Sequence, residues 1–168
     1  ELAHAGVENL VVSGGEPLLR NDLGAILKHA KECGIGTISI LTNGLLVNKE
    51  TVLELAPYTD CISVSFDGCS STSPAYIRRS QRFGELVKAI EAIRNAGIEA
   101  HIIATIHGKN ADDVPAYEAL AEKLHATLNF SMFSCRPSSE ELASLIPSET
   151  CLHTLGFQTF ANPHSPSV

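Results

Sequence analysis

The sequence predicts an α/β fold built around a parallel sheet, and three observations predict it. Five strand-like apolar runs alternate with five helical patterns along the 168 residues. The strand-like runs are nearly continuous Val, Ile, Leu and Phe segments, which is typical of strands covered on both faces. A polar cluster follows each of these runs. Successive strand–helix units favour parallel strands with right-handed connections, and they exclude all-β and helical-bundle folds.

The elements are expected in a regular order along the chain. The residues before Gly6 have the pattern of a helix that ends at a glycine cap, so we expect the chain to begin inside a domain. Strands are expected near residues 7–13, 37–42, 61–66, 100–106 and 127–133. Helices are expected near residues 20–33, 49–56, 83–96, 112–125 and 139–146.

Two of the helices have a clear apolar face. In the helix near 83–96 this face is formed by Leu86, Val87, Ile90 and Ile93, before Gly97. In the helix near 112–125, Leu120 and Leu124 lie on one face, after an acidic start at residues 112–113. Spacing alone leaves the choice between an open sheet and a barrel unresolved.

Composition excludes several classes of function. The chain carries 19 acidic and 12 basic residues, without a Lys/Arg-rich run, so binding to nucleic acid is disfavoured. No apolar stretch approaches the roughly 20 residues of a membrane span, and no signal-peptide pattern opens the chain. We therefore expect a cytoplasmic protein that binds no membrane.

The cysteines indicate neither a disulfide framework nor a local metal site, because their number is odd and their spacings are wide. They are Cys33, Cys61, Cys69, Cys135 and Cys151. We expect Cys33 and Cys61 to be small buried hydrophobic residues. Cys69 and Cys135 follow strand-like runs and are candidates for a ligand or a radical relay.

The most informative segment is Gly14-Gly15-Glu16-Pro17, directly after the first strand. Paired glycines allow a sharp turn and the close approach of a ligand to the main chain. Glu16 places a carboxylate at the mouth of this loop, where it could hold a cationic group. Pro17 is suited to the first turn of a helix. Taken alone, the segment is equally consistent with an ordinary strand-to-helix turn.

The other strands also end in polar clusters. These are Thr42-Asn43-Gly44, Ser65-Phe66-Asp67-Gly68, His107-Gly108-Lys109-Asn110 and Ser134-Cys135-Arg136-Pro137. Several of them are common turn sequences when considered one at a time. Because parallel strands end at the same edge of a sheet, together they predict a binding face there.

The first three of these motifs, in this order, resemble those of radical S-adenosylmethionine (SAM) enzymes. The "GGEP" motif, Leu41-Thr42-Asn43-Gly44 and Ser65-Phe66-Asp67-Gly68 resemble that family's second, third and fourth strand ends. Ile77-Arg78 and Phe83 resemble its "IRG…F" segment, although Arg79 replaces the usual glycine and the spacing is shortened. Thr105 to Asn110 resembles the exit of its fifth strand.

The resemblance covers roughly residues 1 to 137 and is close to the peptide-modifying and haem-modifying, SPASM-like branch. It implies a partial (β/α)6 TIM-like barrel with parallel strands, in which the first β/α unit is truncated. Residues 1–146 would form this incomplete core, and residues 147–168 a tail or a truncated continuation.

The resemblance also implies a set of cofactor-binding residues. Gly14, Gly15 and Glu16, with Pro17 after them, would bind the amino group of the methionyl part of SAM. Ser65 and Asp67 would contact its ribose or carboxylate side, and Asn43 its ribose. Arg78 would pair with the methionyl carboxylate, with Arg79 as the competing choice.

One part of the family pattern is missing. The Cys-x-x-x-Cys-x-x-Cys loop that holds a [4Fe–4S] cluster follows the family's first strand, and no three cysteines here have that spacing. We expect the cluster ligands upstream of Glu1, and we expect the isolated chain to be inactive. The parent protein would take electrons from a flavodoxin or ferredoxin and form a 5′-deoxyadenosyl radical. That radical would abstract hydrogen from a peptide, a tetrapyrrole-type substrate or another small molecule.

Two other functions stay open at this point. One is a barrel lyase or isomerase without an iron–sulfur cluster, with Lys109 as Schiff-base former or His107 as base. We expect both residues to lie solvated in a loop, which disfavours that role. The other is a non-catalytic SAM-binding module that has lost its cluster.

Overall fold

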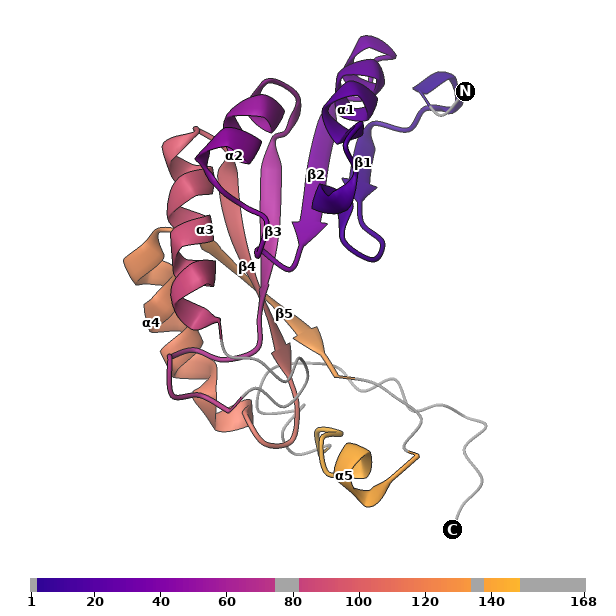
Figure 1. Cartoon of the computed structure of the whole chain (residues 1–168). Coiled ribbons are helices and arrows are strands. Elements are labelled where there is room, and N and C mark those ends of the chain that lie inside the picture. The colour runs from indigo at the N-terminus through magenta and orange to yellow at the C-terminus, as the bar shows by residue number, and fades with distance from the viewer. Residues whose placement is uncertain (1–2, 75–81, 134–137, 149–168) are drawn as a thin grey trace.

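A five-stranded parallel sheet forms the centre of the molecule, and its strand order follows the order of the chain (Figure 1). The computed structural model describes residues 3–74, 82–133 and 138–148. The strands are β1 (Asn9–Val12), β2 (Thr37–Thr42), β3 (Cys61–Phe66), β4 (Glu99–Ile106) and β5 (Thr127–Met132). The helices are α1 (Leu23–Glu32), α2 (Lys49–Leu55), α3 (Phe83–Asn95), α4 (Val114–Leu124) and α5 (Glu140–Ala143). The predicted α/β fold and parallel sheet are confirmed.

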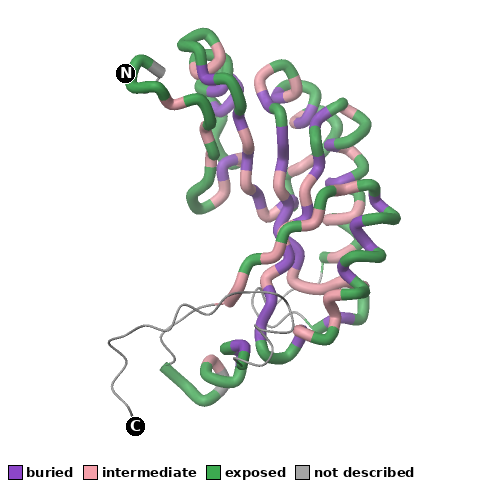
Figure 2. The backbone as a smooth tube through the Cα atoms, turned by 180° about the vertical axis from the view of Figure 1, so that it is seen from behind, coloured by how far each residue is buried: buried purple, intermediate pink, exposed green. Residues whose placement is uncertain are grey.

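The helices pack on one face of the sheet, and the opposite face is open. Along β4 buried positions alternate with half-buried ones, and along β5 half-buried positions alternate with exposed ones (Figure 2). The expectation of strands covered on both faces is therefore wrong for these two strands. In β4 the apolar appearance misled because Ile103, on the open face, interrupts an otherwise polar series. In β5 the polar residues Thr127, Asn129 and Ser131 already alternate with apolar ones.

The hydrophobic core lies between the sheet and helices α1 to α4. Its fully buried members alternate along the strands, as Ile38 and Ile40 in β2 and Ile62 and Val64 in β3 do. The predicted apolar face of α3 is confirmed in its centre, because Ile90 and Ile93 are 0% exposed. Burial of a side chain of this size contributes about 1.5–3 kcal/mol. Within the described residues, no helix is long and apolar enough to cross a bilayer.

Two helices differ from their predicted extents. The helix expected from residue 20 begins at Leu23, because a separate 3₁₀ turn, Pro17–Leu19, precedes it. Pro17 therefore starts this short turn and not the α-helix itself. The helix expected over 139–146 is the single turn α5, which begins after Ser139, whose hydroxyl accepts a hydrogen bond from Leu142 N–H.

Asp60 links α1, β2 and β4 at the edge of the sheet where the strands begin. Its carboxylate Oδ2 accepts hydrogen bonds from Lys31 Nζ, 2.7 Å away at the end of α1, and from Ile38 N–H, also 2.7 Å away. Its backbone N–H donates to Ile38 O, and its backbone O accepts from Glu99 N–H. The hydrogen bond from the Lys31 ammonium is the main cause of the lowered pKa of Asp60.

Gly44, after β2, occupies a position that no other residue fits well. Its φ is +80°, and a Cβ there would lie 2.6 Å from Val64 Cγ1 and 3.0 Å from Leu86 Cδ2. The absence of a side chain therefore lets this loop pack directly on β3 and α3.

We expect Asp60→Asn to destabilise the protein by about 1 kcal/mol at pH 7, a value kept small because the carboxylate is 47% exposed. Because the folded-state pKa is lowered, the stabilising effect is present above the unfolded pKa and is lost as pH falls. Urea unfolding should show the difference from wild type shrinking below about pH 4. A difference that stayed constant down to pH 2 would contradict this role.

We expect Gly44→Ala to lower the free energy of unfolding by about 2–4 kcal/mol, from backbone strain plus overpacking. Gly34→Ala is the matched control, because Gly34 has a φ of +97° but open space around its Cβ position. It should cost only the backbone contribution of about 1–2 kcal/mol. Equal losses in urea unfolding would show that the contacts with Val64 and Leu86 are unimportant.

Candidate functional site

The Glu16 carboxylate joins the loops that follow β1 and β2. Its Oε1 accepts hydrogen bonds from Leu18 N–H at 3.2 Å and from the Thr42 hydroxyl at 2.7 Å. Its Oε2 accepts from Asn43 N–H at 2.8 Å. Glu16 is extended, with a φ of −141°, and caps the turn that Pro17 begins. Two loops that are distant in sequence are thus held by one side chain.

This arrangement limits what Glu16 offers to a ligand. A carboxylate has about four acceptor positions, and the three protein hydrogen bonds use most of them. Its negative charge remains, and the side chain is half-buried. Glu16 is thus first a positioning residue for the two loops, and its predicted contact with a cationic group stays a prediction.

The two glycines before Glu16 leave the main chain accessible. Gly14 and Gly15 are exposed, and no atom lies within 4 Å of the position that a Cβ would take at either residue. Gly14 has a φ of +145°, which side-chain-bearing residues rarely adopt. Pro17 is buried beneath this loop. The segment therefore presents backbone groups at the carboxyl end of β1.

Thr42, Asn43 and Gly44 form a turn held by their own side chains. Gly44 N–H donates to the Thr42 hydroxyl at 3.1 Å, and Leu45 N–H donates to Asn43 Oδ1 at 2.9 Å. The simple turn interpretation is confirmed, yet the same turn supplies two of the three donors to Glu16. Being a turn and forming part of a site are compatible here.

Ser65 and Asp67 lie at the end of β3, beside these loops. Ser65 is 8% exposed and pairs with Ile103 of β4, on the open face of the sheet. Asp67 is half-buried, and both residues make interactions within the protein. Arg78 and its competitor Arg79 fall outside the described residues.

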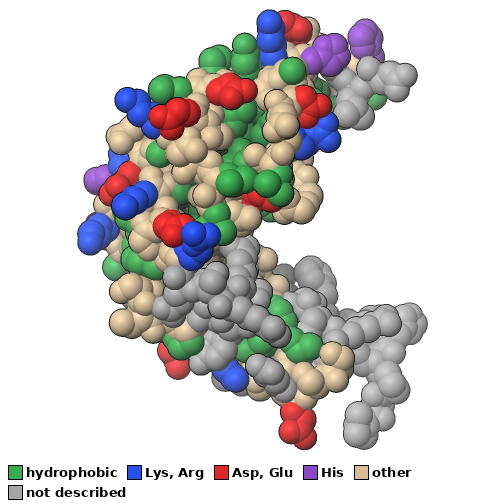
Figure 3. Space-filling model, in the orientation of Figure 1, with side chains coloured by type: hydrophobic (Ala, Val, Ile, Leu, Met, Phe, Trp, Pro, Cys, Tyr) green, Lys and Arg blue, Asp and Glu red, His purple; other side chains and the backbone are tan. Residues whose placement is uncertain are grey.

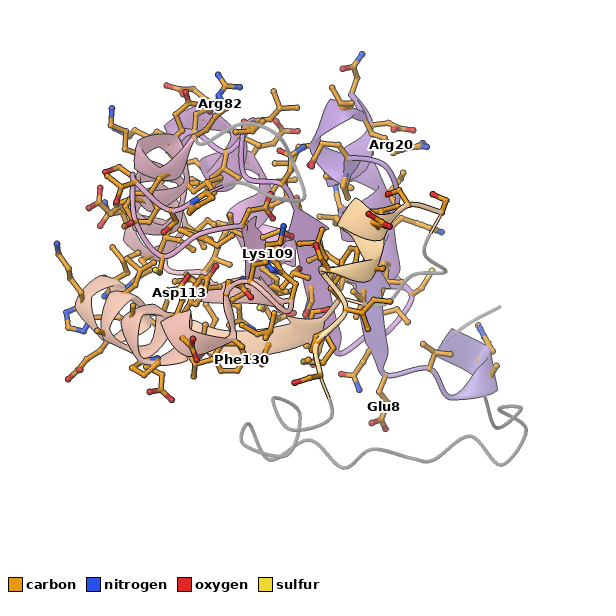
Figure 4. All side chains as sticks on the ribbon, turned by 90° about the horizontal axis from the view of Figure 1, so that it is seen from below. Glu8, Arg20, Arg82, Lys109, Asp113 and Phe130 are labelled. Carbon is orange, nitrogen blue, oxygen red and sulfur yellow. The ribbon has the colours of Figure 1, made fainter. Side chains whose placement is uncertain are left out.

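The loop after β4 corrects one expectation. His107 is 1% exposed and not solvated; its Nδ1 accepts a hydrogen bond from Lys109 N–H at 3.2 Å, and burial lowers its pKa. Asn110 fixes the same loop, because its Oδ1 accepts from His107 N–H and its Nδ2 donates to Thr105 O. Lys109 is exposed, as expected, near the middle of the edge seen in Figure 4, with Arg20 and Arg82 at the periphery.

Sequence reasoning missed three polar residues on the open face of β4 and β5. His101 Nε2 lies 2.8 Å from Glu99 Oε1, and Asn129 Nδ2 lies 3.2 Å from His101 Nδ1. The available signal was their every-second-residue spacing, which marks a single face of a strand. Figure 3 shows the molecule hollowed on the side opposite α3 and α4.

The described cysteines do not form a cluster site. Cys33 is exposed on the end of α1, contrary to expectation, because that helix turns its polar face outward there. Cys61 is buried in β3 as expected, and burial raises its pKa; Cys69 is half-buried and lies 3.5 Å from the Ser73 hydroxyl. Among the described residues no three His, Cys, Asp or Glu side chains could hold a metal ion. Cys135 and Cys151 lie outside them.

We expect Glu16→Gln to destabilise the fold by about 1–3 kcal/mol, because the amide nitrogen must face one of the three backbone or hydroxyl donors. In a double-mutant cycle with Thr42→Val, the coupling energy should be about 0.5–1.5 kcal/mol. Thr51→Val, an unrelated hydroxyl on α2, serves as the control partner and should show no coupling to Glu16. Urea unfolding measures all four variants of each cycle, and coupling near zero with Thr42 would contradict the bridge.

Known proteins show the same sequence pattern and fold. A model of the radical SAM superfamily matches residues 1–121. Mycofactocin maturase MftC of Mycolicibacterium smegmatis is 30% identical over 82% of this chain and 35% of its own length. Fe-coproporphyrin III synthase of Methanosarcina barkeri is 30% identical over 73% of this chain and 31% of its own length. The chain thus spans about a third of the length of these relatives.

Solved structures agree on the fold. SuiB of Streptococcus suis bound to S-adenosylmethionine superposes with a TM-score of 0.67 at 20% identity, covering 79% of this chain and 31% of SuiB. SuiB bound to its precursor peptide SuiA gives a TM-score of 0.68, with 79% and 30% covered. A domain of pyruvate-formate lyase-activating enzyme from Bacteroides vulgatus gives 0.60 at 22% identity, with 87% and 91% covered. Because the superfamily model matches more than half of its residues, this chain belongs to the radical SAM superfamily.

Proposed function

We propose that the full-length protein is a radical SAM enzyme whose SAM site is formed by the loops after β1, β2 and β3. The observation that carries the proposal is the bridge from Glu16 to Thr42 and Asn43, because it assembles two of these loops into one surface. The enzyme would form a 5′-deoxyadenosyl radical from SAM and use it to abstract hydrogen from a substrate.

The charges and exposed backbone of this edge suit the ligand. SAM carries an ammonium, a sulfonium and a carboxylate, so it requires an anion and acceptors at one end and a cation at the other. We assign the ammonium to the main chain of Gly14 and Gly15, in the field of Glu16. We assign the carboxylate to Arg78, with Arg79 as the competing choice, because a guanidinium binds a carboxylate through two parallel hydrogen bonds.

The ribose is assigned to the polar ends of β2 and β3. Asn43 is half-buried and already donates its backbone N–H to Glu16, so its backbone lies next to the assigned ammonium site. Ser65 and Asp67 lie at the end of β3, the neighbouring strand in the sheet. These three residues and Pro17, which shapes the first loop, complete the proposed set.

A [4Fe–4S] cluster supplies the electron for SAM cleavage in the radical SAM superfamily. The described cysteines do not fit it, since they are dispersed over α1, β3 and the loop after β3. We propose that its ligands precede Glu1 and that flavodoxin or ferredoxin is the reductant. The contribution of this chain is to bind and orient SAM and to enclose the substrate.

The substrate is proposed to be a peptide or a tetrapyrrole. The similar proteins include a maturase, a coproporphyrin-related synthase and an enzyme solved with its precursor peptide. A cluster-free lyase mechanism has less support, because Lys109 is exposed and His107 is 1% exposed, with its Nδ1 already accepting a hydrogen bond from Lys109 N–H.

The anaerobically reconstituted full-length protein should convert SAM to methionine and 5′-deoxyadenosine when reduced with dithionite. Glu16→Gln should lower this rate at least about tenfold, because the loops that hold the ammonium lose their common acceptor. Glu118→Gln, an exposed carboxylate on α4, is the control and should retain the wild-type rate. Chromatographic detection of 5′-deoxyadenosine measures both, and a wild-type protein with an intact cluster that formed none would contradict the proposal.

The isolated 168-residue chain should bind SAM more weakly than about 100 μM, which corresponds to about −5.5 kcal/mol. The reason is that the cluster-facing side of the ligand would have no partner. Isothermal titration calorimetry measures this affinity. Tighter binding would instead favour a non-catalytic SAM-binding module.

A further inference from the structure

A hydrogen-bonded relay crosses the open face of β4 and β5. Glu99 Oε1 lies 2.8 Å from His101 Nε2, and His101 Nδ1 lies 3.2 Å from Asn129 Nδ2. The Thr127 hydroxyl donates to the same Glu99 oxygen at 3.4 Å. His101 is shielded, with 21% of its side chain exposed, whereas the Glu99 side chain is 63% exposed.

The relay determines how each member is oriented. An ionised carboxylate only accepts hydrogen bonds, so His101 Nε2 must carry the proton. The hydrogen bond with His101 also lowers the pKa of Glu99, which keeps that carboxylate ionised. In a neutral imidazole the other nitrogen is then an acceptor, and it requires a donor from Asn129. Nδ2 faces Nδ1 in the structure, in agreement with this requirement.

The position of Asn129 connects the relay with the proposed SAM site. Asn129 pairs with Ile103 of β4, and Ile103 pairs with Ser65 of β3. Ser65 and Asn129 therefore lie at the same height on the open face, two strands apart, or roughly 10 Å at the usual strand spacing. A molecule that lies on the open face next to Ser65 would be within reach of the Asn129 amide.

We propose that Asn129 is a specificity-determining residue for the substrate, held by Glu99 and His101 so that its Oδ1 accepts a hydrogen bond from a peptide N–H. The relay uses one amide hydrogen, and within the described part of the chain the Oδ1 and the second hydrogen remain for a ligand. An extended peptide residue presents its own N–H and C=O on the same side, so it complements both. This inference rests on the proposed function, because it takes the open face of the sheet as the substrate site, and it favours a peptide over a tetrapyrrole.

The first test is spectroscopic and uses full-length protein labelled with ¹⁵N in histidine. At pH 8, two-bond ¹H–¹⁵N correlation spectra should show His101 as the Nε2–H tautomer. Glu99→Gln should raise the Nδ1–H fraction, because a carboxamide can donate as well as accept. A wild-type Nδ1–H tautomer would overturn the proposal, since Asn129 would then present its amide the other way round.

The second test compares two probes that differ by one N–H group, N-methylacetamide and N,N-dimethylacetamide. At equal concentration, the side-chain amide signal of Asn129 in ¹⁵N-asparagine-labelled protein should shift about threefold more with N-methylacetamide. His101→Phe and Glu99→Gln should reduce this ratio towards one. Ser131→Ala, on the same face of β5 and outside the relay, should keep it. A wild-type ratio of one would overturn the proposal.

The same preparations are assayed for SAM cleavage, which separates the two levels of inference. If the protein forms 5′-deoxyadenosine but shows no selectivity between the probes, the proposed function is supported and the role of Asn129 is refuted. If the protein shows the expected tautomer and selectivity but does not cleave SAM, the relay is supported as a peptide-binding site and the radical chemistry is refuted.

Discussion

The site depends on one carboxylate. Glu16 accepts hydrogen bonds from Leu18, Thr42 and Asn43, so it determines the path of its own loop and the separation of that loop from the next. The ends of β1 and β2 are therefore assembled by the protein itself before any ligand binds. Preorganisation of this kind lowers the entropic cost of binding. It also gives the motif a structural role that a ligand-centred interpretation overlooks.

The sheet divides the molecule into two chemically different halves. One face is buried under helices and is aliphatic, and it provides most of the stability through residues such as Ile40 and Ile102. The other face carries hydroxyl, amide and imidazole groups, among them Ser65, His101 and Asn129. Stability and the proposed recognition thus depend on alternate residues of the same strands, and a substitution on the open face need not disturb the core.

The sequence was sufficient for the parallel sheet and for the approximate extents of most elements, and it singled out the segment at Glu16, which joins two loops in the structure. Those features follow from local patterns: hydrophobic periodicity, a glycine pair and a proline. It was insufficient where the environment is set by distant segments. His107 is buried although a polar loop sequence follows it, and Cys33 is exposed although it lies beside an apolar segment. Likewise, the partners of Glu16 lie 26 and 27 residues away, beyond any local pattern.

Asp60 has a consequence for the mechanics of the domain. Side-chain and backbone hydrogen bonds tie this residue to the end of α1, to β2 and to the first residue of β4, all at the edge opposite the candidate site. These hydrogen bonds fix the positions of the strands at that edge. The register of the strands is thus set at one edge and the loops of the candidate site at the other, so substitutions in those loops need not alter the register.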